Sequence, residues 1–252
     1  MPSISKRLII LAAGLVLALP AHAFDWGSLM KDVISKPAGQ PDATGVDALS
    51  PTDINAGLKE ALTRGADAAV AQLGQKDGFF GNDALKITLP PALQKAEKAM
   101  RMFGMGKQAD ELVLSMNRAA EAAVPEARTL LVGAVKEMTL EDAKGILTGG
   151  KTSATDFFRK KTEATLTERF GPIVKTTTDK VGLAQQYNQY AGMAAQFNLV
   201  DKKQANVEQY VTQQALDRLY TLIGEKETAI RANPLQAGSD LLKKVFGAVT
   251  GK

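Results

Sequence analysis

Apolar residues recur at helical spacing over most of the chain from Thr52 onward. In the first such stretch, Thr52 or Asp53 can cap a helix that runs through about Leu73 and carries its apolar side chains on one broad face. No run of β-branched residues is long enough to form a central strand. The sequence therefore predicts an all-α fold, an irregular multi-helix bundle of about eight to ten helices. Further helices are expected at residues 91–103, 107–123, 125–137, 140–147, 153–169, 172–197, 205–231 and 235–249.

Local signals set the ends of these helices. Thr139 and Asp142 have the spacing of a capping box, which predicts a helix start at residue 140. Lys86 to Leu89 alternate like a very short extended piece before two prolines open the next helix. Breaks between helices are expected at Gly104, Gly106, Gly149, Gly150, Gly171 and Pro172.

Residues 1–23 have the organisation of a secretory signal peptide. Lys6 and Arg7 precede an apolar run of about a dozen residues, which is shorter than the roughly 20 residues of a membrane-spanning helix. Ala21-His22-Ala23 is a small-x-small cleavage site. We expect cleavage after Ala23 and a periplasmic protein; the alternative is an uncleaved membrane anchor.

Residues 24–51 separate this signal from the helical domain, which we place at residues 52–252. Phe24–Ser35 has apolar residues at roughly helical spacing, so it can dock on the domain or make a peripheral contact with a membrane. Docking is the preferred interpretation, because the polar side lacks clustered Lys and Arg. Residues 36–51 contain three prolines and two glycines and are typical of a flexible linker.

The composition excludes several chemistries. His22 is the only histidine and lies in the predicted signal, and the chain has no cysteine. The mature protein would therefore lack Ser-His-Asp and Cys-His catalysis, zinc sites built from Cys or His, and haem held by those ligands. The net charge of +4 is too balanced for nucleic-acid binding, which needs a concentrated basic face. We expect no cofactor and no metal site.

The stretch GILTGGKT, residues 145–152, fits the phosphate-loop pattern G-x-x-x-x-G-K-[ST]. A true phosphate loop follows a buried strand, whereas this stretch lies in and after the helix that Thr139 and Asp142 cap. We therefore expect no nucleotide binding. The Gly-Gly joint between two helices remains of interest, because free N–H groups at the start of the second helix can hold an anion beside Lys151. The simpler interpretation is a helix end followed by a helix start.

Four segments resemble the DUF4197 family of bacterial secreted proteins. They are GLKEAL (57–62), DGFFGNDALKITLP (77–90), MNRAAEAAVPEA (116–127) and MTLEDAKGILTGGKTSATDFFRKKT (138–162), and the resemblance runs in order from about residue 54 to residue 197. The resemblance implies an exported α-helical domain of uncharacterised function, without a catalytic assignment. It also implies that the family retains the Gly-Gly turn and the Ala154–Phe158 segment but does not require Lys151 or Thr152, which a phosphate loop needs.

Polar residues on two predicted helices and at the joint could line a pocket. The alternative is a set of structural hydrogen bonds and ion pairs that join helices, and this is the preferred interpretation. Tyr187, Tyr190 and Phe197 are expected in the core rather than on a binding platform. The candidate ligand-binding residues are Asn117, Arg118, Glu121, Asp142, Thr148, Gly149, Gly150, Thr155, Asp156 and Arg159.

Two classes of function follow. The first is a non-enzymatic binding or structural protein of the cell envelope, which holds a small anionic or amphipathic ligand, or a segment of an envelope protein, at the Gly-Gly joint. The second is a carboxylate-dependent hydrolase that uses Glu121, Asp142 or Asp156. We prefer the first, because the mature chain lacks histidine, the commonest general base, and has no recognisable pair of catalytic acids. The sequence leaves the oligomeric state open.

Overall fold

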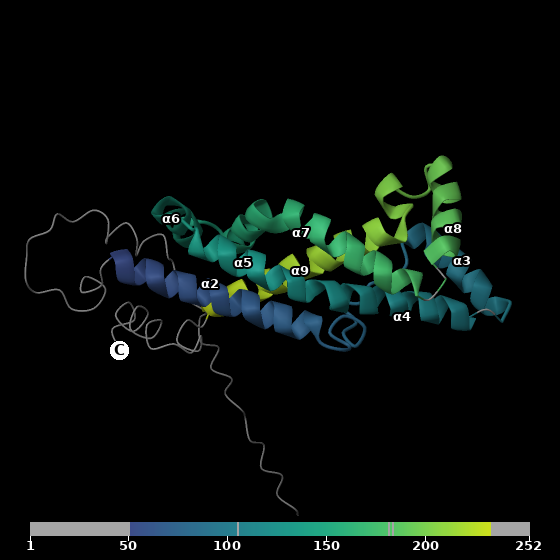
Figure 1. Cartoon of the computed structure of the whole chain (residues 1–252), viewed down its shortest axis with the longest axis horizontal. Helices are drawn as coiled ribbons and strands as arrows, with labels where there is room; N and C mark the ends of the chain where they lie inside the picture. Colours follow the sequence, from purple (N-terminus) through teal and green to yellow (C-terminus); the bar gives the residue numbers. More distant parts are fainter. Residues whose placement is uncertain (1–50, 105, 181, 183, 233–252) are drawn as a thin grey trace, which may run out of the picture.

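The computed structural model describes residues 51–104, 106–180, 182 and 184–232 (Figure 1). The described residues form eight α-helices and two short 3₁₀-helices without any strand, which confirms the all-α prediction at the low end of the expected helix number. The signal, the amphipathic segment, nearly all of the linker and the helix predicted at 235–249 lie outside the described residues. The elements are α2 (Pro51–Gly74), α3 (Pro91–Met102), α4 (Gly106–Ala123), η2 (Val124–Glu126), α5 (Ala127–Lys136), α6 (Leu140–Thr148), α7 (Ser153–Asp179), α8 (Ala184–Gln196), η3 (Lys202–Gln204) and α9 (Val207–Ala232).

The long helices run roughly along the long axis of the molecule (Figure 1). Helix α7 packs along α9 and also against α4, while α2 packs on α5 and α9. Helix α6 lies at one end of the bundle, and α3 and α8 lie at the other end (Figure 1). The two ends therefore present different surfaces on one elongated core.

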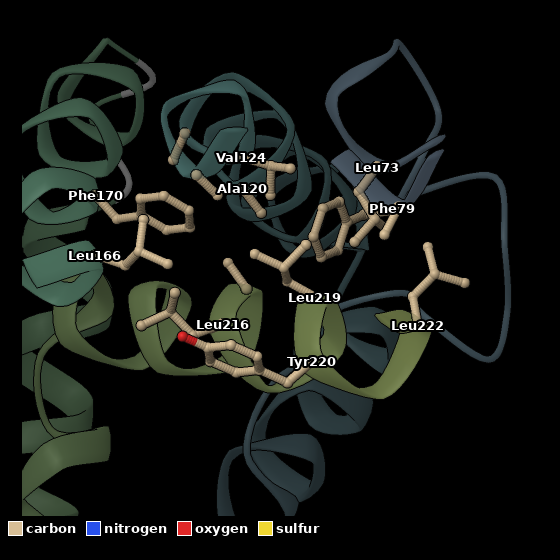
Figure 2. Close-up of a cluster of buried hydrophobic side chains, with 14 of the residues drawn as sticks. Leu73, Phe79, Ala120, Val124, Leu166, Phe170, Leu216, Leu219, Tyr220 and Leu222 are labelled. Carbon is tan, nitrogen blue, oxygen red and sulfur yellow. The ribbon is translucent and has the colours of Figure 1, made fainter. Parts of the chain in front are cut away.

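The core between α4, α7 and α9 is made of fully buried apolar side chains (Figure 2). Leu166 and Phe170 of α7 are one helical turn apart and lie over Leu216 of α9, with Ala120 of α4 closing the other side (Figure 2). Burying such side chains contributes about 1.5–3 kcal/mol each, so this shared seam is the main source of stability. The neighbouring labelled members of the cluster are Leu73, Phe79, Val124, Leu219, Tyr220 and Leu222.

Helix α7 continues through the Gly171-Pro172 pair, so the break predicted there is wrong. Phe170 and Val174 on either side of the pair are fully buried, and this packing keeps the helix regular where Pro172 removes one backbone hydrogen bond. The observed break comes later, where Gly182 adopts a positive φ of 69°. The helix predicted at 172–197 is therefore divided between the end of α7 and α8.

The segment between α2 and α3 contains no strand. Its residues 86–89 pair with side chains instead, since Tyr210 of α9 donates its hydroxyl to the Thr88 carbonyl at 2.8 Å. Arg218, also on α9, donates to the Lys86 carbonyl at 3.3 Å. The short extended piece that the sequence predicts is thus held by helices and not by a partner strand.

The tyrosines of the described part are mostly buried, but one predicted core aromatic is not. Tyr187 is buried and stacks on Tyr210 with ring centroids 6.4 Å apart, as expected. The prediction for Phe197 is wrong, because this side chain is 75% exposed beyond the end of α8. The side chain of Tyr190 lies outside the described part. Tyr220 is buried and shares a 2.8 Å hydrogen bond with the hydroxyl of Thr162.

We predict that the protein loses stability in alkali, above about pH 10. Burial raises the pKa of Tyr220 to about 12 and also raises the pKa values of Tyr187 and Tyr210. An unfolded tyrosine ionises near pH 10, so above about pH 10 the unfolded state has lost protons that the folded state keeps, and the free energy of unfolding falls until about pH 12. Urea unfolding at a series of alkaline pH values measures this fall, and Tyr220→Phe should make it shallower. A urea midpoint that stays constant through this range would contradict the prediction.

Candidate functional site

The Gly-Gly joint connects α6 to α7 at one end of the bundle (Figure 1). Thr139 caps α6 through a complete capping box with Asp142, as the sequence predicts. The helix continues to Thr148, so helical residues occupy the position where a phosphate loop needs a strand. At the far side of the joint, the hydroxyl of Ser153 donates to the Ile146 carbonyl at 2.7 Å and ties the start of α7 to the end of α6.

Gly149 is required at this joint by close contact rather than by a left-handed backbone. Its φ of −79° is accessible to any residue, and Gly150 is not among the glycines with positive φ. A Cβ at Gly149 would lie 2.6 Å from the Gly145 carbonyl oxygen and 2.7 Å from the Ser153 Cβ. A Cβ at Gly150 would have no neighbour within 4 Å. Only the first glycine of the pair is therefore fixed by packing.

The N-terminus of α7 is occupied by a carboxylate of the protein itself. Glu227 of α9 accepts hydrogen bonds from the backbone N–H groups of Ala154 and Thr155, both at 3.0 Å. It also accepts the hydroxyl of Thr155 at 2.8 Å. The prediction of free amides at the joint is wrong for these two residues. An anion does bind there, as helix N-termini favour, but it is a side chain of α9.

Arg231 completes the same network one turn later on α9. Its guanidinium donates to Glu227 at 2.8 Å, to the Ile146 carbonyl at 2.9 Å and to the Ser153 hydroxyl at 2.8 Å. The Glu227 side chain is 6% exposed and the Arg231 side chain 19%. Arg231 thus neutralises the buried carboxylate of Glu227 and satisfies the Ile146 carbonyl in the last turn of α6. Together the two side chains join α6, α7 and α9.

An open groove of about 680 Å³ runs between α7 and α9 beside this network. At Gly224 the two helices approach closely, since a Cβ there would lie 3.4 Å from the Thr155 hydroxyl. Three of the predicted residues, Thr155, Asp156 and Arg159, line this groove. The remaining lining residues are mostly small or hydroxylated: Thr152, Tyr220, Thr221, Gly224, Glu225, Thr228, Ala229 and Ala232.

Charged side chains border the groove. Arg159 lies over the ring of Tyr220, 4.5 Å from its centroid, and donates to Glu163 at 2.9 Å and to Asp217 at 3.1 Å. Burial lowers the pKa of Arg159, but the hydrogen bond with Asp217 and the two carboxylate charges outweigh this effect and raise the pKa overall. Asp156 is exposed and accepts a hydrogen bond from the Thr152 hydroxyl at 3.2 Å. With Glu225 also at its edge, the groove has a negative border.

The α4 candidates, Asn117, Arg118 and Glu121, anchor the segment between α2 and α3 and are not among the groove-lining residues. Buried Asn117 accepts from the N–H of Ile87 and donates to its carbonyl, both at 2.8 Å, as a neighbouring strand would. Glu121 accepts the N–H groups of Phe79 and Phe80 at 3.2 Å.

Arg118 and Asp142 also have structural partners. Arg118 donates to Glu121 at 2.5 Å and to Asp77 at 2.6 Å, and the bond with Glu121 is the main cause of its raised pKa. Asp142 accepts the backbone N–H and the hydroxyl of Thr139, and these bonds lower its pKa. The contacts of Arg118 and Asp142 are those of residues that join and cap helices.

The candidate residues therefore do not form one site. They lie in three places: on α4 beside the segment between α2 and α3, at the Gly-Gly joint, and along the groove. Sequence reasoning missed Glu227 and Arg231, which carry the charges of the network. Their four-residue spacing on a helix is also that of an ordinary surface ion pair, so no local signal distinguishes them. Within the described ranges, no group of three or more Asp or Glu side chains can hold a metal ion. None of the described helices combines the length and apolar character of a membrane span.

Comparison with known proteins gives one match. A family model described as "Protein of unknown function (DUF4197)" matches residues 48–247, a range that contains all the helices from α2 to α9. No curated protein and no solved structure matches the chain significantly. The resemblance that the sequence predicts is confirmed, and the match brings no residue roles.

We predict that Glu227→Ala lowers the free energy of unfolding by about 3 kcal/mol, because it leaves two buried N–H groups and the Arg231 guanidinium without their acceptor. Glu227→Gln, which keeps one acceptor oxygen, should cost less than Glu227→Ala. Urea unfolding measures both values. Glu225→Ala is the matched control on the exposed side of α9 and should change stability by less than about 0.5 kcal/mol. Equal effects at positions 225 and 227 would contradict the role given to Glu227.

We predict that Gly149→Ala destabilises the protein by about 1–3 kcal/mol, because the added Cβ meets a backbone oxygen and the Ser153 side chain at less than 3 Å. Gly150→Ala has open space for its Cβ and should be neutral within about 0.5 kcal/mol. Thermal unfolding of the two variants separates these cases. A Gly149→Ala protein as stable as Gly150→Ala would show that the joint relaxes freely.

Proposed function

We propose that this chain, which belongs to the DUF4197 family of proteins of unknown function, is a non-enzymatic binding protein of the cell envelope. Its occupant, an amphipathic ligand or a segment of a partner protein, lies in the groove between α7 and α9. The observation that carries the proposal is the groove itself. It is open, holds about 680 Å³ and is lined largely by small side chains that leave room along two helices.

The occupant lies beside the Gly-Gly joint and not inside it. The amides at the start of α7 already bind Glu227, so a free anion would have to displace a buried carboxylate that is also paired with Arg231. The groove border carries Asp156 and Glu225, while Arg159 is already engaged by Glu163 and Asp217. This charge pattern favours an amphipathic occupant with a basic group over an anionic one.

The proposal is non-enzymatic because the three carboxylates considered for hydrolysis act in separate places. Glu121 binds two backbone N–H groups and Arg118, Asp142 closes a capping box, and Asp156 accepts the Thr152 hydroxyl. A hydrolase of that type needs two carboxylates that face each other across a substrate. No specific contact of these residues favours the hydrolase.

Ala229→Trp should remove the occupant, because an indole on an exposed lining residue of α9 fills the groove without disturbing the core. The measurement is native mass spectrometry, with lipid extraction, on protein purified from the periplasm. We expect a bound mass on the wild-type protein that is reduced at least about tenfold in the variant. Ala71→Trp, at an exposed position of α2, is the matched control and should keep the bound mass.

Two outcomes would count against the proposal. A bound mass that persists in Ala229→Trp places the occupant elsewhere on the protein. Wild-type protein that carries neither a ligand nor a partner, when purified gently from its own compartment, leaves only a structural role in the envelope. Asp156→Asn combined with Glu225→Gln then tests the charge argument, since it should weaken the binding of a basic occupant and reduce its dependence on salt.

A further inference from the structure

The turn between α3 and α4 exposes two large apolar side chains. Met102 is 85% exposed and Phe103 is 80% exposed, and we refer to these two residues as the apolar tip. Gly104 follows with a φ of 79°, which turns the chain toward the start of α4. The turn lies at the end of the bundle opposite α6 and the Gly-Gly joint (Figure 1). The tip is therefore a surface separate from the groove.

One ion pair crosses the turn of the hairpin that carries the tip, and a second lies within α3. Arg101 binds Glu97 of the same helix at 2.7 Å and Asp110 of α4 at 2.5 Å. Behind the turn, Ala109 of α4 is buried. The two helices are thus tied together directly behind Met102 and Phe103, so the apolar tip is presented on a defined support.

Lysines follow the same face of α3 behind the tip. Lys95 and Lys98 are exposed and precede Met102 by seven and four residues, so they lie on one helical stripe with it. The helical rise places their Cα atoms about 10 Å and about 6 Å behind Met102. On α4, Lys107 is 87% exposed and lies 3.8 Å from Glu111. Glu97 and Asp110 share Arg101, and Glu111 lies beside Lys107, so these five groups carry one net negative charge. Lys95 and Lys98 reverse its sign and place the positive charge of the hairpin on the exposed face of α3.

We propose that the apolar tip inserts into the surface of a membrane that contains anionic phospholipids. An apolar group that enters the boundary between headgroups and acyl chains reaches about 5–10 Å deep. At that depth Lys95 and Lys98 lie at the level of the lipid phosphates, where their long side chains extend to place the ammonium groups. The described residues of the turn expose two apolar side chains, a small area that fits a deformable lipid surface better than a rigid protein surface, which needs a larger complementary patch.

Leu140 is another exposed apolar residue, and its charged neighbours differ from those of the tip. Leu140 is 67% exposed at the start of α6, but Glu141 and Asp142 follow it directly. Lys160 and Lys161 lie near enough to Asp142 to contribute to its lowered pKa, so the charge around Leu140 is mixed and this residue serves as a comparison site for the tip. Phe197 and Leu199 beyond α8 are exposed as well and provide a second comparison.

Co-sedimentation with vesicles tests the proposal on the secreted protein, without its predicted signal segment. Vesicles of phosphatidylethanolamine with about one third phosphatidylglycerol should bind the protein, and vesicles of phosphatidylcholine alone should bind it less. Met102→Ser with Phe103→Ser should reduce binding about tenfold, because the inserted apolar area is lost. Leu140→Ser should leave binding unchanged. Lys95→Gln with Lys98→Gln should remove most of the preference for anionic vesicles.

A fluorescent label gives an independent readout of insertion. Because the chain has no cysteine, Phe103→Cys provides a single attachment site for an environment-sensitive dye. The dye emission should shift to the blue with anionic vesicles, and a dye on Ala71→Cys in α2 should not respond. This readout does not depend on the groove, so it remains informative whether or not an occupant is found there.

Three results would overturn the proposal. The first is wild-type protein that binds none of these vesicles. The second is equal binding by the Met102/Phe103 variant, above all if Phe197→Ser with Leu199→Ser abolishes it. The third is a tip-dependent association between protein molecules, seen by light scattering without lipid, which would assign the apolar tip to a protein contact instead.

Discussion

Every buried backbone amide and carbonyl outside the helical ladders needs a hydrogen-bond partner, and this constraint explains why Asn117, Glu121 and Glu227 lie inside the bundle. Glu227 supplies two acceptors for the first turn of α7. Asn117 supplies both a donor and an acceptor for Ile87, and Glu121 supplies acceptors for the chain at Phe79 and Phe80. In each case a helix supplies a side chain to backbone groups that have no partner within a helix, and the side chain that does so is buried.

These connections also decide which part of the surface stays open. At the α6 end, the hydrogen bonds of Glu227 and Arg231 tie α9 to α7 and α6, and small residues such as Gly224 let α7 and α9 meet closely. Thr221, Thr228 and Ala229 then lie beside a groove rather than under a neighbouring helix. The distinctive feature of the opposite end is the exposed turn between α3 and α4. The molecule thus combines a recessed surface and a projecting one.

The sequence predicts the helices well because apolar periodicity, caps and glycines act over a few residues. The capping box at Thr139 and the start of α7 at Ser153 follow from such signals. The continuation of α7 past Pro172 could not be predicted, because burial of Phe170 and Val174 outweighs a local breaker. The separation of the candidate residues into three places could not be predicted either, because it depends on contacts between residues far apart in the sequence. Glu227 contacts α7 from 72 and 73 residues away, and no pattern within one helix reveals such a partner.

The phosphate-loop pattern at residues 145–152 acquires a different meaning from the position of Glu227. The amides behind that pattern form a working anion receptor, and the protein has tethered its own anion to the same scaffold. A tethered group acts at an effective concentration in the millimolar range or above, so a free anion would have to compete with it for the same amides. Without this glutamate the two buried N–H groups and the Arg231 guanidinium would lack their acceptor, so a single side chain makes this anion-binding helix start a structural joint.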